Sequence, residues 1–111
     1  MYKRQAYYLT AGLYALKDGR HQSERTLARA LREERDKRNS ASIEGRFLAL
    51  LDADSDQIAH RLRYTVNLVE GGLDFVRLLV DLWSWFRPDR VVQARWAREF
   101  YRDKGKKEVE A

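Results

Sequence analysis

Cysteine is absent from this sequence of 111 residues, and proline and histidine are scarce. Without cysteine the chain cannot form disulfides, nor can it offer thiolate ligands to an iron–sulfur cluster or a structural zinc ion. The longest stretch without a charged residue, 5–16, has 12 residues, fewer than the ~20 that span a bilayer. We therefore expect a cytoplasmic protein with no disulfide framework and no membrane span.

A single proline and only six glycines interrupt a sequence rich in Ala, Leu, Arg and Glu, a composition that favours helix over strand. The sequence predicts an all-α fold, a compact bundle of about six helices. Asp54 and Gln57 have the spacing of a capping box, and Pro88 fits the first turn of the last helix. The length predicts one helical domain over residues 1–103, followed by a charged, frayed tail over 104–111. The expected helices cover about residues 4–17, 23–38, 42–53, 54–70, 73–86 and 88–103.

Two of these expected helices have few polar residues. Residues 73–86 are apolar over most of the helix circumference, so we expect this helix to be central. Its thin polar stripe consists of Asp74, Arg77, Asp81 and Ser84. Helix 4–17 has almost no polar face, which predicts either central insertion or packing against a partner outside this chain. Trp96 and Phe100 have the spacing of core residues.

Residue combinations that support catalysis are missing. The two histidines, His21 and His60, have no metal-binding spacing, and no serine lies in a nucleophile motif. No glycine-rich phosphate loop precedes a helix. The acidic run Asp52, Asp54 and Asp56 lacks the glycine and the distal glutamate of a calcium loop, so we interpret it as solvated helix ends. We expect no enzymatic activity, no metal site and no cofactor.

Basic residues outnumber acidic ones by 22 to 17, which gives a net charge of +5. Arginines recur at helical spacing, and a guanidinium group binds phosphate oxygens bidentately. Such stripes indicate a nucleic-acid partner. The alternative is that they form surface ion pairs with neighbours such as Glu33 and Glu99, and such pairs contribute little to the stability of the fold. The stripes are Arg25, Arg29 and Arg32 in helix 23–38, and Arg95, Arg98 and Arg102 in helix 88–103.

Several motifs, occurring in order, resemble one family. They cover residues 27–31 (LARAL), 42–51 (SIEGRFLALL), 56–63 (DQIAHRLR), 73–75 (LDF) and 93–101 (QARWAREFY). Together they make the chain, from about residue 6 to residue 101, similar to CasB, the small subunit of the type I-E CRISPR Cascade complex, and most similar to thermophile-type members. Residues 1–5 do not resemble the family at this point, and family members carry a further N-terminal helical region. We therefore expect an N-terminally truncated version, which accounts for the few polar residues of helix 4–17.

The resemblance implies a non-enzymatic all-α subunit that is present as a pair. Its expected partners are the large subunit, the backbone subunits, a second copy of itself, and the crRNA–target DNA complex with its displaced single strand. The function expected from it is antiviral defence, with guide RNA pairing reading the sequence and Arg–phosphate contacts stabilising the R-loop. The alternative is a helical adaptor that binds acidic protein surfaces and no nucleic acid.

Positions are carried over residue by residue. Arg29, Arg46 and Arg63 match basic positions of the family, whereas Tyr64 stands where some members have another arginine. Arg90, Arg95 and Arg98 belong to the family's basic C-terminal segment, as the resemblance implies. With the basic residues of the helices, this predicts a set of nucleic-acid-binding residues: Arg29, Arg32, Arg46, Arg61, Arg63, Arg90, Arg95 and Arg98.

Overall fold

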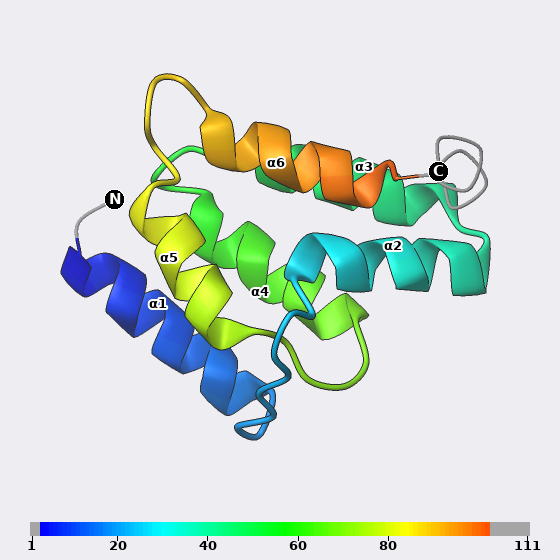
Figure 1. Cartoon of the computed structure of the whole chain (residues 1–111), viewed down its shortest axis with the longest axis horizontal. Helices are drawn as coiled ribbons and strands as arrows, with labels where there is room; N and C mark the ends of the chain where they lie inside the picture. Colours follow the sequence, from blue (N-terminus) through cyan, green and yellow to red (C-terminus); the bar gives the residue numbers. More distant parts are fainter. Residues whose placement is uncertain (1–2, 103–111) are drawn as a thin grey trace.

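The computed structural model describes residues 3–102, and within them the all-α prediction is confirmed (Figure 1). The described part forms six helices, with no strand beyond one isolated bridge between His21 and Leu73. The predicted tail, residues 104–111, lies outside the described residues. None of these helices is long and apolar enough to cross a membrane. The helices are α1 (Lys3–Leu16), α2 (Leu27–Arg38), α3 (Ala41–Leu51), α4 (Ile58–Leu68), α5 (Phe75–Trp83) and α6 (Val91–Phe100).

The helices pack as two groups, α1 with α5 and α2 with α3 and α6, and both groups contact α4. Helix α1 lies along α5, while α2 packs against α6, α3 and α4. Helix α3 packs on α4, and α1 also contacts α4 (Figure 1). The arrangement leaves one side of α3 and α4 and one side of α1 and α5 facing solvent.

Aromatic side chains fill the core beside α6. Phe47 of α3 stacks on Phe100 of α6 with ring centroids 4.1 Å apart. Trp85 meets Trp96 edge to face at 5.0 Å. All four side chains are at most 1% exposed. The prediction that Trp96 and Phe100 are core residues is therefore confirmed.

The predicted capping box at the start of α4 is present. The backbone N–H of Gln57 donates to Asp54 Oδ1 (3.0 Å), and that of Asp54 donates to Gln57 Oε1 (3.2 Å). The two bonds satisfy backbone donors that the helix itself leaves unpaired. Regular helix follows from Ile58.

The prediction that Pro88 opens the last helix is wrong by three residues. Pro88 lies in a turn that ends with Arg90 in the left-handed conformation, at φ 52°. Asp89 Oδ1 then accepts the backbone N–H of Val91, the first residue of α6 (3.2 Å). The turn, rather than the proline, sets where α6 begins.

The expectation that the helix near 73–86 is central is also wrong. Helix α5 lies at the surface, where Val76 is 66% and Val80 54% exposed. Its polar residue Asp81 is 3% exposed, because its carboxylate faces Arg95 and Trp96 of α6. The polar stripe of α5 thus points in part toward α6, and apolar residues point outward.

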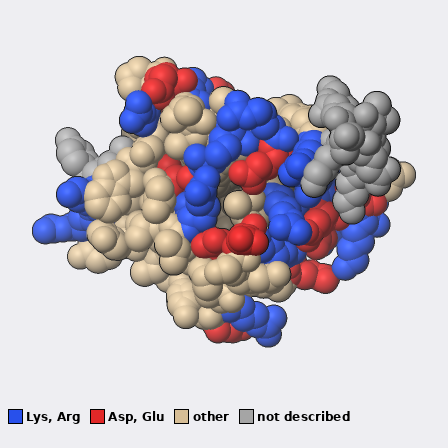
Figure 2. Space-filling model, in the orientation of Figure 1, with Lys and Arg blue, Asp and Glu red and all other residues tan. Residues whose placement is uncertain are grey.

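Helix α1 is peripheral too, so it is not inserted centrally. It buries Ala6, Thr10 and Leu13, which share one helix face. Tyr7 is 53% and Tyr8 71% exposed. Figure 2 shows a broad uncharged surface over α1 and α5. We call its exposed large residues the α1/α5 face: Tyr7, Tyr8, Tyr14, Val76, Val80 and Trp83.

Two connecting segments, 20–25 and 71–74, join the two groups of helices. Leu73 N–H donates to the carbonyl of Arg20 (3.1 Å), and Gln22 N–H donates to the carbonyl of Leu73 (2.9 Å). A Cβ at Gly72 would clash with the carbonyl oxygen of Arg20. This close backbone approach requires glycine at position 72.

Candidate nucleic-acid interface

Four of the eight predicted arginines donate a guanidinium hydrogen bond to another residue of the chain. The contacts run from Arg32 to the carbonyl of Glu99 (2.9 Å), from Arg61 to that of Ala49 (2.6 Å), from Arg90 to that of Leu51 (2.6 Å), and from Arg95 to the carboxylate of Asp81. Arg32, Arg61 and Arg95 are also half-buried. A guanidinium held this way has fewer N–H donors left for a phosphate.

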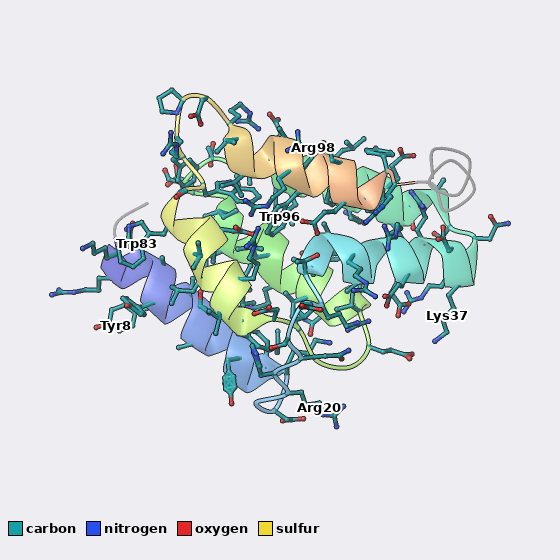
Figure 3. All side chains as sticks on the ribbon, viewed as in Figure 1. Tyr8, Arg20, Lys37, Trp83, Trp96 and Arg98 are labelled. Carbon is teal, nitrogen blue, oxygen red and sulfur yellow. The ribbon has the colours of Figure 1, made fainter. Side chains whose placement is uncertain are left out.

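Arg95 belongs to a buried polar cluster between α5 and α6. Asp81 Oδ2 accepts the indole N–H of Trp96 (2.8 Å), while Asp81 Oδ1 pairs with Arg95. Arg77, one turn before Asp81, approaches the same oxygen at 3.8 Å. Figure 3 shows Trp96 between the two helices. The cluster neutralises a buried carboxylate, which gives Arg95 a structural partner.

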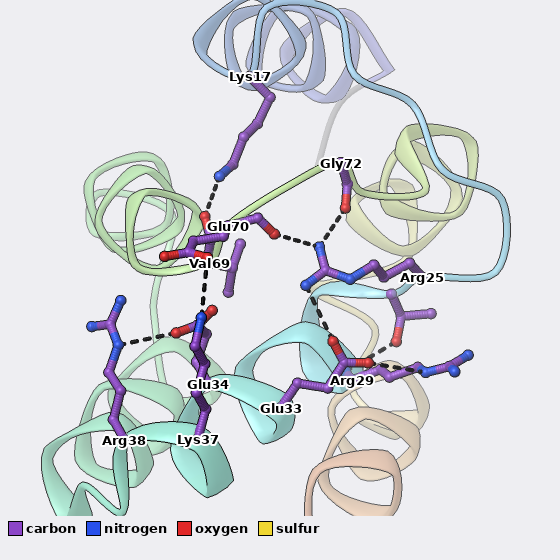
Figure 4. A network of polar contacts seen from close by, with 11 residues as sticks. Lys17, Arg25, Arg29, Glu33, Glu34, Lys37, Arg38, Val69, Glu70 and Gly72 are labelled. Carbon is purple, nitrogen blue, oxygen red and sulfur yellow. Dashed lines mark hydrogen bonds and ion pairs between the residues drawn. The ribbon is translucent and has the colours of Figure 1, made fainter.

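Arg25 precedes α2 and ties the connecting segments together (Figure 4). Its guanidinium donates to the carbonyls of Glu70 (2.8 Å) and Gly72 (2.6 Å), and it pairs with Glu33 at 3.2 Å. Nearby, Lys17 donates its ammonium to the carbonyl of Val69. Burial lowers the pKa of Lys17, and the adjacent Arg25 lowers it further. Lys17 and Arg25 therefore stabilise the fold by binding backbone carbonyls of residues 69–72.

Arg29 shares Glu33 with Arg25. Its Nε lies 3.5 Å from Glu33 Oε1, and its side chain is 51% exposed. The ion-pair interpretation of the sequence therefore holds for Arg29. Figure 2 shows the same mixture over α2 and α6, where acidic side chains lie between the basic ones.

Arg46, Arg63 and Arg98 are different. All three are exposed, and none makes a hydrogen bond or an ion pair within the described part of the chain. Arg98 lies on the outer side of α6 (Figure 3). Arg46 of α3 lies over the ring of Tyr64 of α4, 4.5 Å from its centroid. These guanidinium groups are available to an external anion.

Arg63 and Tyr64 lie on an exposed face of α4 that bears no acidic residue. Helix spacing places His60 and Asn67 on the same face, and both are exposed. No Asp or Glu occurs between Ile58 and Leu68. We call this surface, completed by Arg46 from α3, the α3/α4 face: Arg46, His60, Arg63, Tyr64 and Asn67.

The acidic residue of α3 is engaged elsewhere. Glu44 accepts the hydroxyl of Tyr101 at 2.6 Å, at the end of α6. Burial, the hydrogen bond and the charge of Glu44 raise the pKa of Tyr101 to about 12. Glu44 is therefore held toward α6.

Tyr64 is the residue that sequence reasoning undervalued. Its sequence position suggested only a missing arginine, whereas the structure places its ring under the guanidinium of Arg46. The two residues are 18 positions apart on different helices. Their contact depends on how α3 packs against α4, which no spacing rule predicts.

The described residues offer little for catalysis. Residues 3–102 contain no group of three or more His, Cys, Asp or Glu side chains placed to hold a metal ion. A hollow of about 680 Å³ lies between α1, α4 and the end of α5. It is mostly apolar and contains no histidine, carboxylate or amine. Its lining consists of Gln5, Tyr8, Leu9, Ser55, Ile58, Ala59 and Phe86.

Comparison with known proteins identifies the family. The family model described as CRISPR-associated protein Cse2 matches residues 1–101. The chain belongs to the Cse2 family. This confirms the resemblance to CasB, because solved structures of this similarity carry that name.

Three relatives illustrate how much of a Cse2 protein is present. The CRISPR-associated protein Cse2 of Thermus thermophilus is 64% identical over 114 residues, covering 98% of this chain and 66% of that protein. CasB from T. thermophilus aligns with a TM-score of 0.84 at 68% identity, covering 89% of this chain and 62% of that one. M. ruber CasB aligns with a TM-score of 0.82 at 39% identity, covering 98% and 69%. The chain thus spans slightly less than two thirds of the T. thermophilus relatives.

Proposed function

We propose that this Cse2 chain is a non-enzymatic small subunit of a type I-E CRISPR RNA-guided complex in antiviral defence. In this role it stabilises crRNA-guided target binding by holding the displaced DNA strand of the R-loop. Its partners are the large subunit, the backbone subunits and a second copy of itself. Family membership supports the setting. The DNA contact rests on the exposed basic residues.

The observation that carries the DNA contact is the unpaired state of three arginines. Arg46, Arg63 and Arg98 keep their N–H donors free within residues 3–102. Arginine binds phosphate without regard to base sequence, which suits a complex in which RNA pairing reads the sequence. Arg29 contributes in a lesser way because it shares Glu33. The nucleic-acid role of Arg32, Arg61, Arg90 and Arg95 remains a prediction.

A reconstituted complex tests this proposal. The variant Arg46→Gln/Arg63→Gln/Arg98→Gln is assembled with the large and backbone subunits, and R-loop lifetime is measured on a target duplex. We expect assembly to persist and the R-loop lifetime to shorten. The control is Arg87→Gln, because Arg87 is exposed but bidentately paired with Asp89 (2.8 and 3.3 Å).

The adaptor alternative makes the opposite prediction. If the three arginines bind acidic protein surfaces, the triple variant should no longer assemble with the large and backbone subunits. R-loops formed by whatever complex still assembles with it then have the wild-type lifetime. That result would replace DNA contact by protein contact.

A further inference from the structure

Tyr64 offers an exposed aromatic ring, a group that phosphate binding does not require. The residue is 42% exposed, and the guanidinium of Arg46 lies over its ring, 4.5 Å from the centroid. A guanidinium over an aromatic face is attracted by the ring's negative π surface. The contact restricts where Arg46 can be before any ligand arrives, which reduces the entropy lost on binding.

Unpaired nucleobases stack on two kinds of protein surface, aromatic rings and guanidinium planes. Arg46 and Tyr64 present both at one place. A base inside a duplex is already stacked on its neighbours, so this surface has value only for a single strand. Arginine contacts to phosphate, in contrast, form with single and double strands alike.

The surroundings suit a nucleic-acid strand better than an acidic protein. Arg63 and His60 add donors beside Tyr64, and Asn67 adds an amide one turn further along α4. The acidic residues Asp52, Asp54 and Asp56 lie before α4, in the α3–α4 connection. The carboxylates of an acidic peptide would pair with the cations here, but they would make no contact that uses the exposed ring of Tyr64.

We propose that Tyr64 and Arg46 form a stacking platform for an unpaired base on the α3/α4 face, and that this platform makes the protein prefer single-stranded DNA over duplex. The base stacks on the outer face of the Arg46 guanidinium and on the part of Tyr64 left exposed beside it, and Tyr64 is also the positioning residue for Arg46. The inference rests on the proposed function, since it assumes that the α3/α4 face meets DNA.

The test compares wild type, Tyr64→Phe, Tyr64→Leu and Arg46→Gln for binding to a thymine-rich single strand, the matching duplex and a uridine-rich RNA. Tyr8→Leu is the matched control, because Tyr8 is 71% exposed on α1. Circular dichroism verifies folding of each variant. A strand containing 2-aminopurine reports stacking directly, because its fluorescence is quenched when the base stacks.

We expect Tyr64→Leu to weaken single-strand binding about fivefold or more, the size of one lost stacking contact. Duplex binding and the salt dependence of binding should not change, and the 2-aminopurine quenching should decrease. Tyr64→Phe and Tyr8→Leu should resemble wild type. Arg46→Gln should weaken binding to single strands and to duplex alike. The double variant Arg46→Gln/Tyr64→Leu should lose less single-strand affinity than the sum of the losses in the two single variants.

Two results overturn the inference in distinguishable ways. If wild type binds single strands but Tyr64→Leu binds them equally well with undiminished quenching, the platform is absent while the proposed DNA contact stands. If wild type binds no DNA at low salt and binds only acidic protein, both proposals fail. Equal losses on RNA and DNA support the platform and show that it does not read the sugar.

Discussion

At the scale of single residues, the structure separates arginines that serve the fold from arginines that face solvent. Arg95 and Arg98 are one helical turn apart, yet Arg95 pairs with the buried Asp81 and Arg98 makes no polar contact within the described residues. Helical spacing places both on α6 but does not show which one meets a carboxylate from α5. The partner, rather than the spacing, decides the role.

Asp81 should be among the most sensitive polar positions of the core. Asp81→Ala leaves the indole N–H of Trp96 and the half-buried guanidinium of Arg95 without their acceptor. We expect the free energy of unfolding to fall by about 3–5 kcal/mol. Asp36→Ala, which removes an exposed ion pair with Arg35, should cost about 1 kcal/mol or less. Urea denaturation measures both, and equal losses would show that the cluster is not structural.

Substitution of Gly72 should lower stability because of a clash with backbone, not because a side-chain contact is lost. Gly72→Ala places a methyl group against the carbonyl oxygen of Arg20, which belongs to a hydrogen-bonded backbone and cannot turn away. We expect a loss of about 1–3 kcal/mol. Gly45→Ala, in the open middle of α3, should instead stabilise the protein by about 0.5–1 kcal/mol. Thermal unfolding of the two variants should therefore shift in opposite directions.

At the scale of helices, much of the fold could be predicted from local signals. The Asp54–Gln57 capping box and the core positions of Trp96 and Phe100 are local features, and the structure confirms them. The position of α5 was not predictable in this way. Hydrophobic periodicity shows that one stripe is polar, but whether that stripe faces water or a buried partner depends on α6, which is distant in sequence.

The start of α5 should make stability depend on acid pH. Asp74 caps this helix by accepting the backbone N–H of Arg77, and it also accepts the N–H of Glu24 in the α1–α2 connection. Burial alone would raise the pKa of Asp74, but these N–H donors and the charge of His21 outweigh it and hold the pKa below its usual value of 3.8. A lowered pKa in the folded state stabilises the protein above pH 3.8, and this contribution is lost as the pH falls further.

Comparison of wild type with Asp74→Ala measures that contribution. Removing the cap should cost about 1–2 kcal/mol near neutral pH. The difference between the two proteins should shrink below pH 3.8, as Asp74 is protonated in wild type. A difference that stays constant across the acid range would contradict an ionised cap.

At the scale of the whole molecule, two surfaces differ in kind. The α3/α4 face combines uncompensated arginines with one aromatic ring, whereas the α1/α5 face is apolar. The apolar composition of helix 4–17 was evident from sequence, and its exposure follows from the position of α1 at the edge of the bundle (Figure 1). Which arginines remain unpaired was not evident, because Ala49, Leu51 and Glu99 supply acceptors from other helices.

The α1/α5 face predicts the behaviour of the isolated chain. We expect it to bind the dye ANS in its folded state, because exposed apolar patches of this kind bind such dyes. Val76→Thr/Val80→Thr keeps side-chain shape and should reduce dye fluorescence. Val66→Thr, a buried control, should not lower it. Low dye binding by a sharply and reversibly melting wild type would contradict the prediction.

The most direct test of the central claim is the salt dependence of single-stranded DNA binding by the whole chain. Each phosphate contact contributes a slope of about −0.7 to the logarithm of affinity against the logarithm of salt. Arg46→Gln/Arg63→Gln/Arg98→Gln should reduce the steepness of that slope by about 2, and Arg87→Gln should leave it unchanged. An identical slope for wild type and the triple variant would contradict the assignment of DNA binding to these three arginines.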